Sequence, residues 1–157
     1  IEAGECPAEA VPELKPVMEA VKKQFADISK ENVGVGSTIF AVKPGDGSAR
    51  EQAASCQKVL GGWANIANEY ATKRYRSNLI NWGMLPFLIP QGELPFTNGD
   101  FLFFPHIREA VADKADSITG YVVKEDGLKE FQVTLGELTD DEREIILKGC
   151  LINYNRK

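Results

Sequence analysis

Residues 45–51 combine groups that could bind and activate an anionic substrate. In order they are glycine, aspartate, glycine, serine, alanine, arginine and glutamate. The two glycines allow the backbone to turn tightly or to approach a ligand closely. A helix that begins here would point its free backbone N–H groups and the positive end of its dipole toward the ligand, beside the guanidinium of Arg50. This combination is typical of a site for a carboxylate or a phosphate.

The same residues also fit a purely structural role. Ser48 and Glu51 have the spacing of a capping box, in which each side chain bonds the backbone N–H of the other residue. The pattern predicts a helix over residues 48–60, with Ser48 as its N-cap and the glycine pair 61–62 as its end. On this interpretation Arg50 is a solvated side chain on a capped surface helix.

The segment before this stretch should position it. Residues 37–43 are mostly β-branched and apolar, and they stop at Pro44, so they predict a buried strand. A strand, a glycine turn and a helix together present the helix N-terminus at the carboxyl end of the strand. The local structure and the candidate chemistry therefore agree.

Four short motifs follow one another in a fixed order. They are Gly-Ser-Ala-Arg-Glu-Gln-Ala-Ala at 47–54, Leu-Gly-Gly at 60–62, Asn-Leu at 78–79 and Gly-Met-Leu-Pro at 83–86. In order and spacing they resemble the swivel domain of the aconitase family, which includes the small subunit of 3-isopropylmalate dehydratase. The family pattern reads Gly-Ser-Ser-Arg-Glu-His-Ala, Leu-Gly-Gly, Asn-Leu and Gly-Leu-Leu-Pro. The resemblance is close over residues 45–87 and thins toward residue 157.

The resemblance implies a fold of the α/β class, the three-layer β/β/α swivelling domain. We expect a single domain over residues 1–157, with residues 1–14 as an irregular lead-in or linker. The first residue is isoleucine rather than methionine, which favours a C-terminal domain excised from a longer chain over a free subunit.

The resemblance also implies a reaction, the interconversion of citrate and isocitrate through cis-aconitate by a hydro-lyase. The family serine that acts as base falls on Ser48, and the arginine that binds a substrate carboxylate falls on Arg50. Ala49 occupies the second serine position and would contribute its backbone N–H to substrate binding. The [4Fe–4S] cluster would lie on partner domains or a large subunit, with none bound by this chain, so the isolated domain should be inactive.

Two departures from the family pattern leave alternatives open. Ala49 replaces the second serine and Gln52 replaces the histidine, so the substrate could instead be isopropylmalate or homoaconitate. A second alternative is a non-catalytic regulator that binds an anion or RNA. A third is an unrelated α/β domain in which the motif is only a capped helix.

Composition narrows the class of protein. The chain has 157 residues, 43% hydrophobic and 26% charged, which suits one globular domain. A net charge of −5 argues against a general nucleic-acid or anionic-membrane binder, and no apolar run approaches the roughly 20 residues of a membrane span. Cys6, Cys56 and Cys150 are too scattered for a metal site, and we expect reduced, partly buried thiols in a cytoplasmic protein.

The remaining segments predict further elements. We expect helices over 15–29, 71–82, 107–114 and 139–148, strands over 100–105, 118–124 and 129–135, and a core segment over 84–90. Thr139 and Glu142 form a second capping-box pattern, and Asp126-Gly127 predicts a hairpin turn. Asn65 and Asn68 are poor strand residues, so we do not expect the strand that the family has after the glycine pair. The basic residues 73, 74 and 76 should form a solvated helix face, and the single histidine, His106, has no evident catalytic partner.

Overall fold

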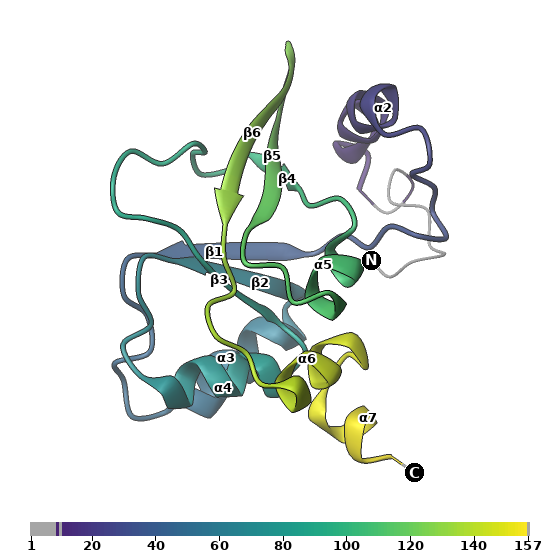
Figure 1. Ribbon diagram of the computed structural model, residues 1–157. Coiled ribbons are helices and arrows are strands. Elements are labelled where there is room, and N and C mark those ends of the chain that lie inside the picture. Colours follow the sequence, from purple (N-terminus) through teal and green to yellow (C-terminus); the bar gives the residue numbers. More distant parts are fainter. Residues whose placement is uncertain (1–8, 10, 157) are drawn as a thin grey trace. The chain divides into compact units, whose positions relative to one another are not determined.

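The computed structural model describes residue 9 and residues 11–156, which form two compact units (Figure 1). Of the described residues, the parallel-sheet unit contains 37–91, 106–118 and 133–156, and the antiparallel-sheet unit contains the others up to residue 36 together with 92–105 and 119–132. The prediction of one domain over 1–157 stays a prediction, and most of the expected lead-in at 1–14 lies outside the described residues. In the described part of the chain, no helix is long and apolar enough to cross a membrane.

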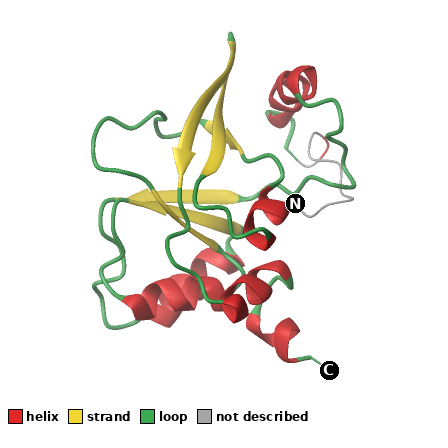
Figure 2. Ribbon diagram, in the orientation of Figure 1, coloured by secondary structure: helices red, strands yellow, loops and turns green. Residues whose placement is uncertain are grey.

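The parallel-sheet unit is built on three parallel strands joined by two helices. In chain order its elements are β1 (Ser37–Ala41), α3 (Arg50–Val59), β2 (Gly62–Ala67), α4 (Lys73–Asn81) and β3 (Leu85–Leu88). The strand order is β1-β2-β3 with both pairings parallel, and both helices lie on one face of the sheet (Figure 2). Because parallel strands end at the same edge, the loops that lead into α3 and α4 share the carboxyl edge of the sheet.

The core of this unit centres on β2 and β3. Ile66 is paired with Phe87, and both side chains are almost fully buried, as are Leu79 and Ile80 of α4. Burial of such a side chain contributes on the order of 1.5–3 kcal/mol. The core character predicted for residues 84–90 is confirmed for β3.

Gly83, which opens the Gly-Met-Leu-Pro motif, allows two backbone segments to meet. Its φ is +71°, and a Cβ atom there would collide with the carbonyl group of Gly149. Gly149 follows the helix α6 (Asp140–Leu147), as the sequence predicts for a helix end. The glycine of this motif is therefore required by close backbone packing as well as by its conformation.

The last part of the parallel-sheet unit is helical. It contains α5 (Ile107–Ala112), α6 and a short helix α7 (Leu151–Asn155) that the sequence reasoning missed. The predicted capping box is confirmed, because Thr139 Oγ1 accepts from Glu142 N at 3.2 Å and Glu142 Oε2 accepts from Thr139 N at 2.9 Å. Thr134 pairs with Leu88 in an antiparallel bridge, which joins the segment before α6 to β3.

The antiparallel-sheet unit contains the helix α2 and a meander of three strands. Its elements are α2 (Leu14–Gln24), β4 (Phe101–Phe103), β5 (Ile118–Lys124) and β6 (Gly127–Val133). The strand order is β4-β5-β6, and residues 125–126 form the predicted hairpin turn. Phe25 packs against Phe103 and Tyr121, with ring centroids 5.3 and 5.4 Å apart. Lys124 Nζ bonds Asp100 Oδ2 at 2.8 Å, and this bond lowers the pKa of Asp100.

Three expectations about these elements are wrong. The strand β2, which we did not expect, is present between β1 and β3, and its buried Asn65 donates a hydrogen bond through Nδ2 to the Tyr75 hydroxyl at 3.0 Å. The strand β1 is not buried, since it has a partner on one side only and residues 37–39 are exposed. The first expected helix, predicted to reach residue 29, ends at Gln24, because the next residue, Phe25, leaves the helical conformation. The fold class itself, α/β with one parallel and one antiparallel sheet, is confirmed.

Candidate functional site

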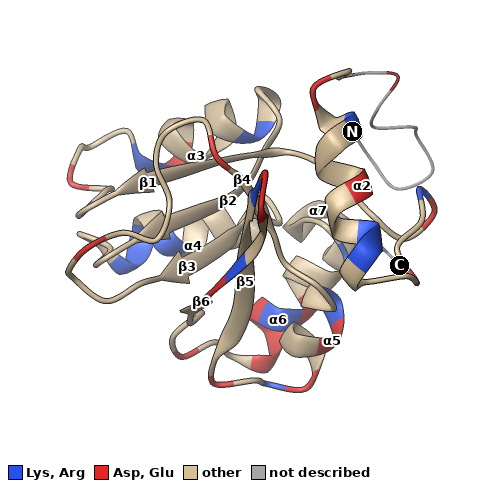
Figure 3. Ribbon diagram, turned by 90° about the horizontal axis from the view of Figure 1, so that it is seen from above, with Lys and Arg blue, Asp and Glu red and all other residues tan. Residues whose placement is uncertain are grey.

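The candidate residues lie in the loop that connects β1 to α3, at the carboxyl edge of the parallel sheet. Ser48 and Ala49 are exposed, and Arg50 is partly buried as the first residue of α3. The loop from β2 to α4 reaches the same edge. The first two residues of α4, Lys73 and Arg74, are exposed there, and the basic residues of this helix are blue in Figure 3. The structure thus places a hydroxyl, a guanidinium and a helix N-terminus together, as the sequence predicts.

The predicted capping role of Ser48 is wrong. The N-cap of α3 is Ala49, with φ −87° and ψ 51°, and no side chain among the described residues caps this helix. Glu51, the other half of the expected capping box, accepts a hydrogen bond from Trp82 Nε1 at 3.1 Å instead. The N–H groups of the first turn of α3 therefore keep no side-chain acceptor and remain able to bind an anion.

Arg50 is oriented by the backbone of its own loop. Its Nε donates to the carbonyl oxygen of Gly45 at 3.2 Å. Among the residues that the structure describes, Arg50 forms no ion pair, and the hydroxyl of Ser48 makes no hydrogen bond. Neither group is therefore engaged by another charged side chain of the described residues, and Arg50 differs from a fully solvated side chain only by its bond to Gly45.

Gly45 holds this loop against α4. Its φ is +95°, and a Cβ atom there would lie 2.5 Å from the Cβ and Cγ atoms of Tyr75. Gly45→Ala should lower the free energy of unfolding by about 2–5 kcal/mol, from a left-handed backbone and an overpacked side chain. Gly47→Ala is the matched control, because Gly47 has open space around its Cβ position and no positive φ. Chemical denaturation of both variants of the full chain measures the difference, and equal stabilities would contradict this packing.

A polar cluster, centred on the buried Tyr75, links the elements that carry the candidate loops. The hydroxyl of Tyr75 accepts hydrogen bonds from Gln57 Nε2 at 2.9 Å and from Asn65 Nδ2 at 3.0 Å. Burial raises the pKa of Tyr70 well above its ordinary value, so its hydroxyl stays protonated and donates to the carbonyl of Phe87 at 3.0 Å. These bonds join α3, β2, α4 and β3 into one scaffold.

Arg76 was expected on a solvated helix face, and this expectation is wrong. Its Nη2 donates to the carbonyl oxygens of Leu135 and Glu137, both at 2.8 Å. Arg76 thus fastens α4 to the segment before α6, while Lys73 and Arg74 are exposed as expected.

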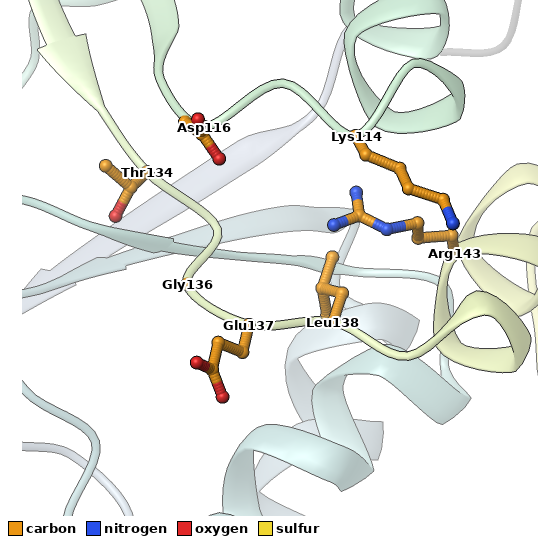
Figure 4. Close-up of a pocket in the computed structure, with 7 residues that line it drawn as sticks. All are labelled: Lys114, Asp116, Thr134, Gly136, Glu137, Leu138 and Arg143. Atoms are coloured by element: carbon orange, nitrogen blue, oxygen red, sulfur yellow. The ribbon is translucent and has the colours of Figure 1, made fainter.

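A separate pocket of about 620 Å³ lies beside α6 (Figure 4). The residues that line it are Lys114, Asp116, Thr134, Gly136, Glu137, Leu138 and Arg143. Lys114 pairs with Asp140 at 2.6 Å and lowers the pKa of that carboxyl, and Arg143 Nη1 donates to the carbonyl of Val111 at 3.1 Å. None of the predicted site residues lines this pocket, and its acidic and basic side chains balance each other.

No group of metal ligands occurs in the described part of the chain. No three histidine, cysteine or acidic side chains converge there. Cys150 is a partly buried free thiol as expected, Cys56 is exposed, contrary to expectation, and Cys6 lies outside the described residues. His106 is the N-cap of α5, and its backbone adopts the left-handed conformation with a φ of 51°. The described residues therefore offer no ligand set for an iron–sulfur cluster.

The parallel-sheet unit is thus an α/β unit that carries the start of α3, the Ser48 hydroxyl and the Arg50 guanidinium in one loop region. The aconitase C-terminal domain family matches residues 13–92, and this chain belongs to that family. It is similar to aconitate hydratase A of Corynebacterium efficiens, with 28% identity over 138 residues. That match covers 82% of this chain and 14% of the relative, so the chain spans a small part of the relative's length.

Proposed function

We propose that this chain is the swivel domain of an aconitase-like hydro-lyase that interconverts citrate and isocitrate through cis-aconitate. The observation that carries the proposal is the uncapped start of α3, with Ser48 and Arg50 beside it, in a chain of the aconitase C-terminal family. The name of the similar protein, aconitate hydratase A, favours this substrate over isopropylmalate or homoaconitate.

In this proposal Ser48 is the catalytic base that removes the carbon-bound proton of the substrate. A serine hydroxyl is a weak base unless its deprotonated form is stabilised. The unsatisfied N–H groups of α3 and the positive charge of Arg50 would supply that stabilisation once the other domains exclude water. Ser48 is free to act because it does not cap the helix.

Arg50 is proposed to bind a carboxylate of the substrate. Its Nε is engaged with Gly45, so the two Nη groups remain as donors to a carboxylate. Ala49 would contribute its backbone N–H alone. Compared with the family serine, this loses at most one hydrogen bond, worth about 0.5–1.5 kcal/mol.

The rest of the active site is proposed to lie on partner domains, in the same polypeptide or in a large subunit. These would carry a [4Fe–4S] cluster, which supplies Lewis-acid chemistry for the leaving hydroxyl when it is bound. The residues of this chain would bind and orient the substrate and move its proton, so the isolated chain should be inactive.

The test uses the complete natural protein that contains this chain, with its cluster-bearing domains or subunit. Purified protein is assayed for formation of the alkene acid from citrate, from isocitrate and from isopropylmalate. The proposal predicts turnover with the first two and little with the third, and no turnover by the 157-residue chain alone. Binding of a tricarboxylate without dehydration would instead support the non-catalytic alternative. A strongly salt-dependent affinity for RNA would point to a regulator.

A further inference from the structure

The carbonyl oxygen of Gly45 accepts two side-chain hydrogen bonds at once. One comes from Arg50 Nε and the other from Thr72 Oγ1, each at 3.2 Å. Thr72 lies in the loop between β2 and α4, so a residue distant in sequence meets Arg50 at one backbone group.

Thr72 forms a second bond through the same hydroxyl. It is the N-cap of α4, and its Oγ1 accepts from the backbone N–H of Tyr75 at 3.2 Å. A hydroxyl carries one hydrogen and two lone pairs. The N–H of Tyr75 can only donate and the carbonyl of Gly45 can only accept, so these partners fix the direction of both bonds. The hydroxyl hydrogen of Thr72 therefore points to Gly45.

The bond from Thr72 completes a series that ties the two loops together. The carbonyl of Val42 accepts from Glu69 N at 3.1 Å, and that of Pro44 accepts from Ala71 N at 2.9 Å. These bonds continue the pairing of β1 and β2 beyond the ends of both strands. The Thr72 hydroxyl makes the next bond, at the carbonyl that also orients Arg50.

The orientation of Arg50 depends on this carbonyl. A guanidinium is planar, so fixing Nε on Gly45 limits the directions in which its two Nη groups can point. If the carbonyl loses its bond to Thr72, it is less constrained, and so is the direction of the guanidinium that is bonded to it. The hydroxyl of the α4 N-cap thus binds the same carbonyl as the guanidinium at the start of α3.

We propose that Thr72 is a positioning residue, which holds the carbonyl of Gly45 in place and thereby presents Arg50 to its ligand. Its consequence for catalysis rests on the proposed function of Arg50 as a carboxylate-binding group. The positioning itself can be measured without any substrate.

The experiment compares Thr72→Val, Thr72→Ser and Thr139→Val. Thr72→Val has nearly the same shape but loses the hydroxyl, and Thr72→Ser restores both bonds. Thr139→Val is the matched control, because Thr139 caps α6 with the same 3.2 Å geometry. Both valine variants should lower the midpoint of denaturation, because each removes an N-cap.

The first measurement follows the Nε–H signal of Arg50 by NMR of the full 157-residue chain labelled with ¹⁵N-arginine. We expect Thr72→Val to shift this signal and speed its exchange with water several-fold, and Thr72→Ser and Thr139→Val to leave it unchanged. An unchanged signal in Thr72→Val, or an equal change in Thr139→Val, would overturn the proposal, because Thr72 would then be a helix cap and nothing more.

The second measurement is the kinetics of the same variants in the complete protein. Thr72→Val should raise KM about 2- to 10-fold with a smaller change in kcat, as expected for one weakened hydrogen bond. Thr72→Ser should restore KM, and a KM left unchanged by Thr72→Val would overturn the catalytic consequence. A wild-type protein without hydro-lyase activity would count against the proposed function alone, since the Nε–H signal tests the positioning separately.

Discussion

Ser48→Ala should lower kcat of the complete protein by about 10²–10⁴-fold, the usual contribution of a general base. KM should change little, because in the proposed function Arg50 and the backbone N–H groups of α3 hold the substrate. The free energy of unfolding should stay within about 0.5 kcal/mol of the wild type, since Ser48 caps no helix. If Ser48 were the N-cap, as the sequence pattern predicts, its removal would instead cost about 0.5–2 kcal/mol.

The matched control for this prediction is Ser55→Ala on the same helix. Ser55 Oγ donates to the carbonyl of Gln52 at 3.3 Å, so this change also removes a serine hydroxyl from α3 but not from its start. Kinetics of both variants, together with their denaturation curves, separate catalysis from stability. A fully active Ser48→Ala protein would refute the proposal that Ser48 is the catalytic base.

Arg50→Lys should raise KM about ten- to a hundredfold, as expected for loss of a charge-assisted hydrogen bond to a carboxylate. Lysine keeps the positive charge but lacks the planar fork, and it cannot donate to Gly45 and bind a carboxylate bidentately together. The change should affect kcat less than KM, because it weakens binding in the ground state as well as in the transition state.

Arg74→Lys is the control for this second prediction. Arg74 is an exposed residue in the first turn of α4, at the same edge of the sheet. If both substitutions raise KM equally, the effect is not specific to the guanidinium of Arg50, and its particular role is refuted. If Arg50→Lys leaves KM unchanged, positive charge alone is sufficient at this position. Steady-state kinetics over a range of substrate concentrations make the comparison.

Local sequence signals predicted those elements whose residues interact with near neighbours. The capping box of α6 joins residues three apart, and the turn at 125–126 lies within one hairpin, so both could be predicted and both are present. The apolar segment that becomes β3 was predicted for the same reason. Such features depend little on the rest of the fold.

The errors arise where distant contacts override local preference. Asn65 disfavours a strand by itself, but inside the fold its amide meets the hydroxyl of Tyr75, which comes from another element. Ser48 and Glu51 have the spacing of a capping box, yet Glu51 bonds Trp82 at the end of α4. No pattern within a few residues contains this information.

The candidate site was predicted in part. The strand, loop and helix around Ser48 and Arg50 follow from the order of β-branched residues, glycines and helix formers. The role of Thr72 could not be predicted, because it requires the loops after β1 and β2 to lie side by side. A threonine before a helical segment signals a cap, but not the second bond that its hydroxyl makes.

The most direct test of the central claim follows the hydrogen that Ser48 is proposed to remove. The complete protein is incubated with isocitrate in D₂O, and deuterium in the substrate carbon–hydrogen bond is measured by NMR for the wild type and for Ser48→Ala. We predict rapid exchange by the wild type and none by the variant, with substrate binding retained by both. Exchange at the wild-type rate in Ser48→Ala would contradict the account, because another group would then be the base.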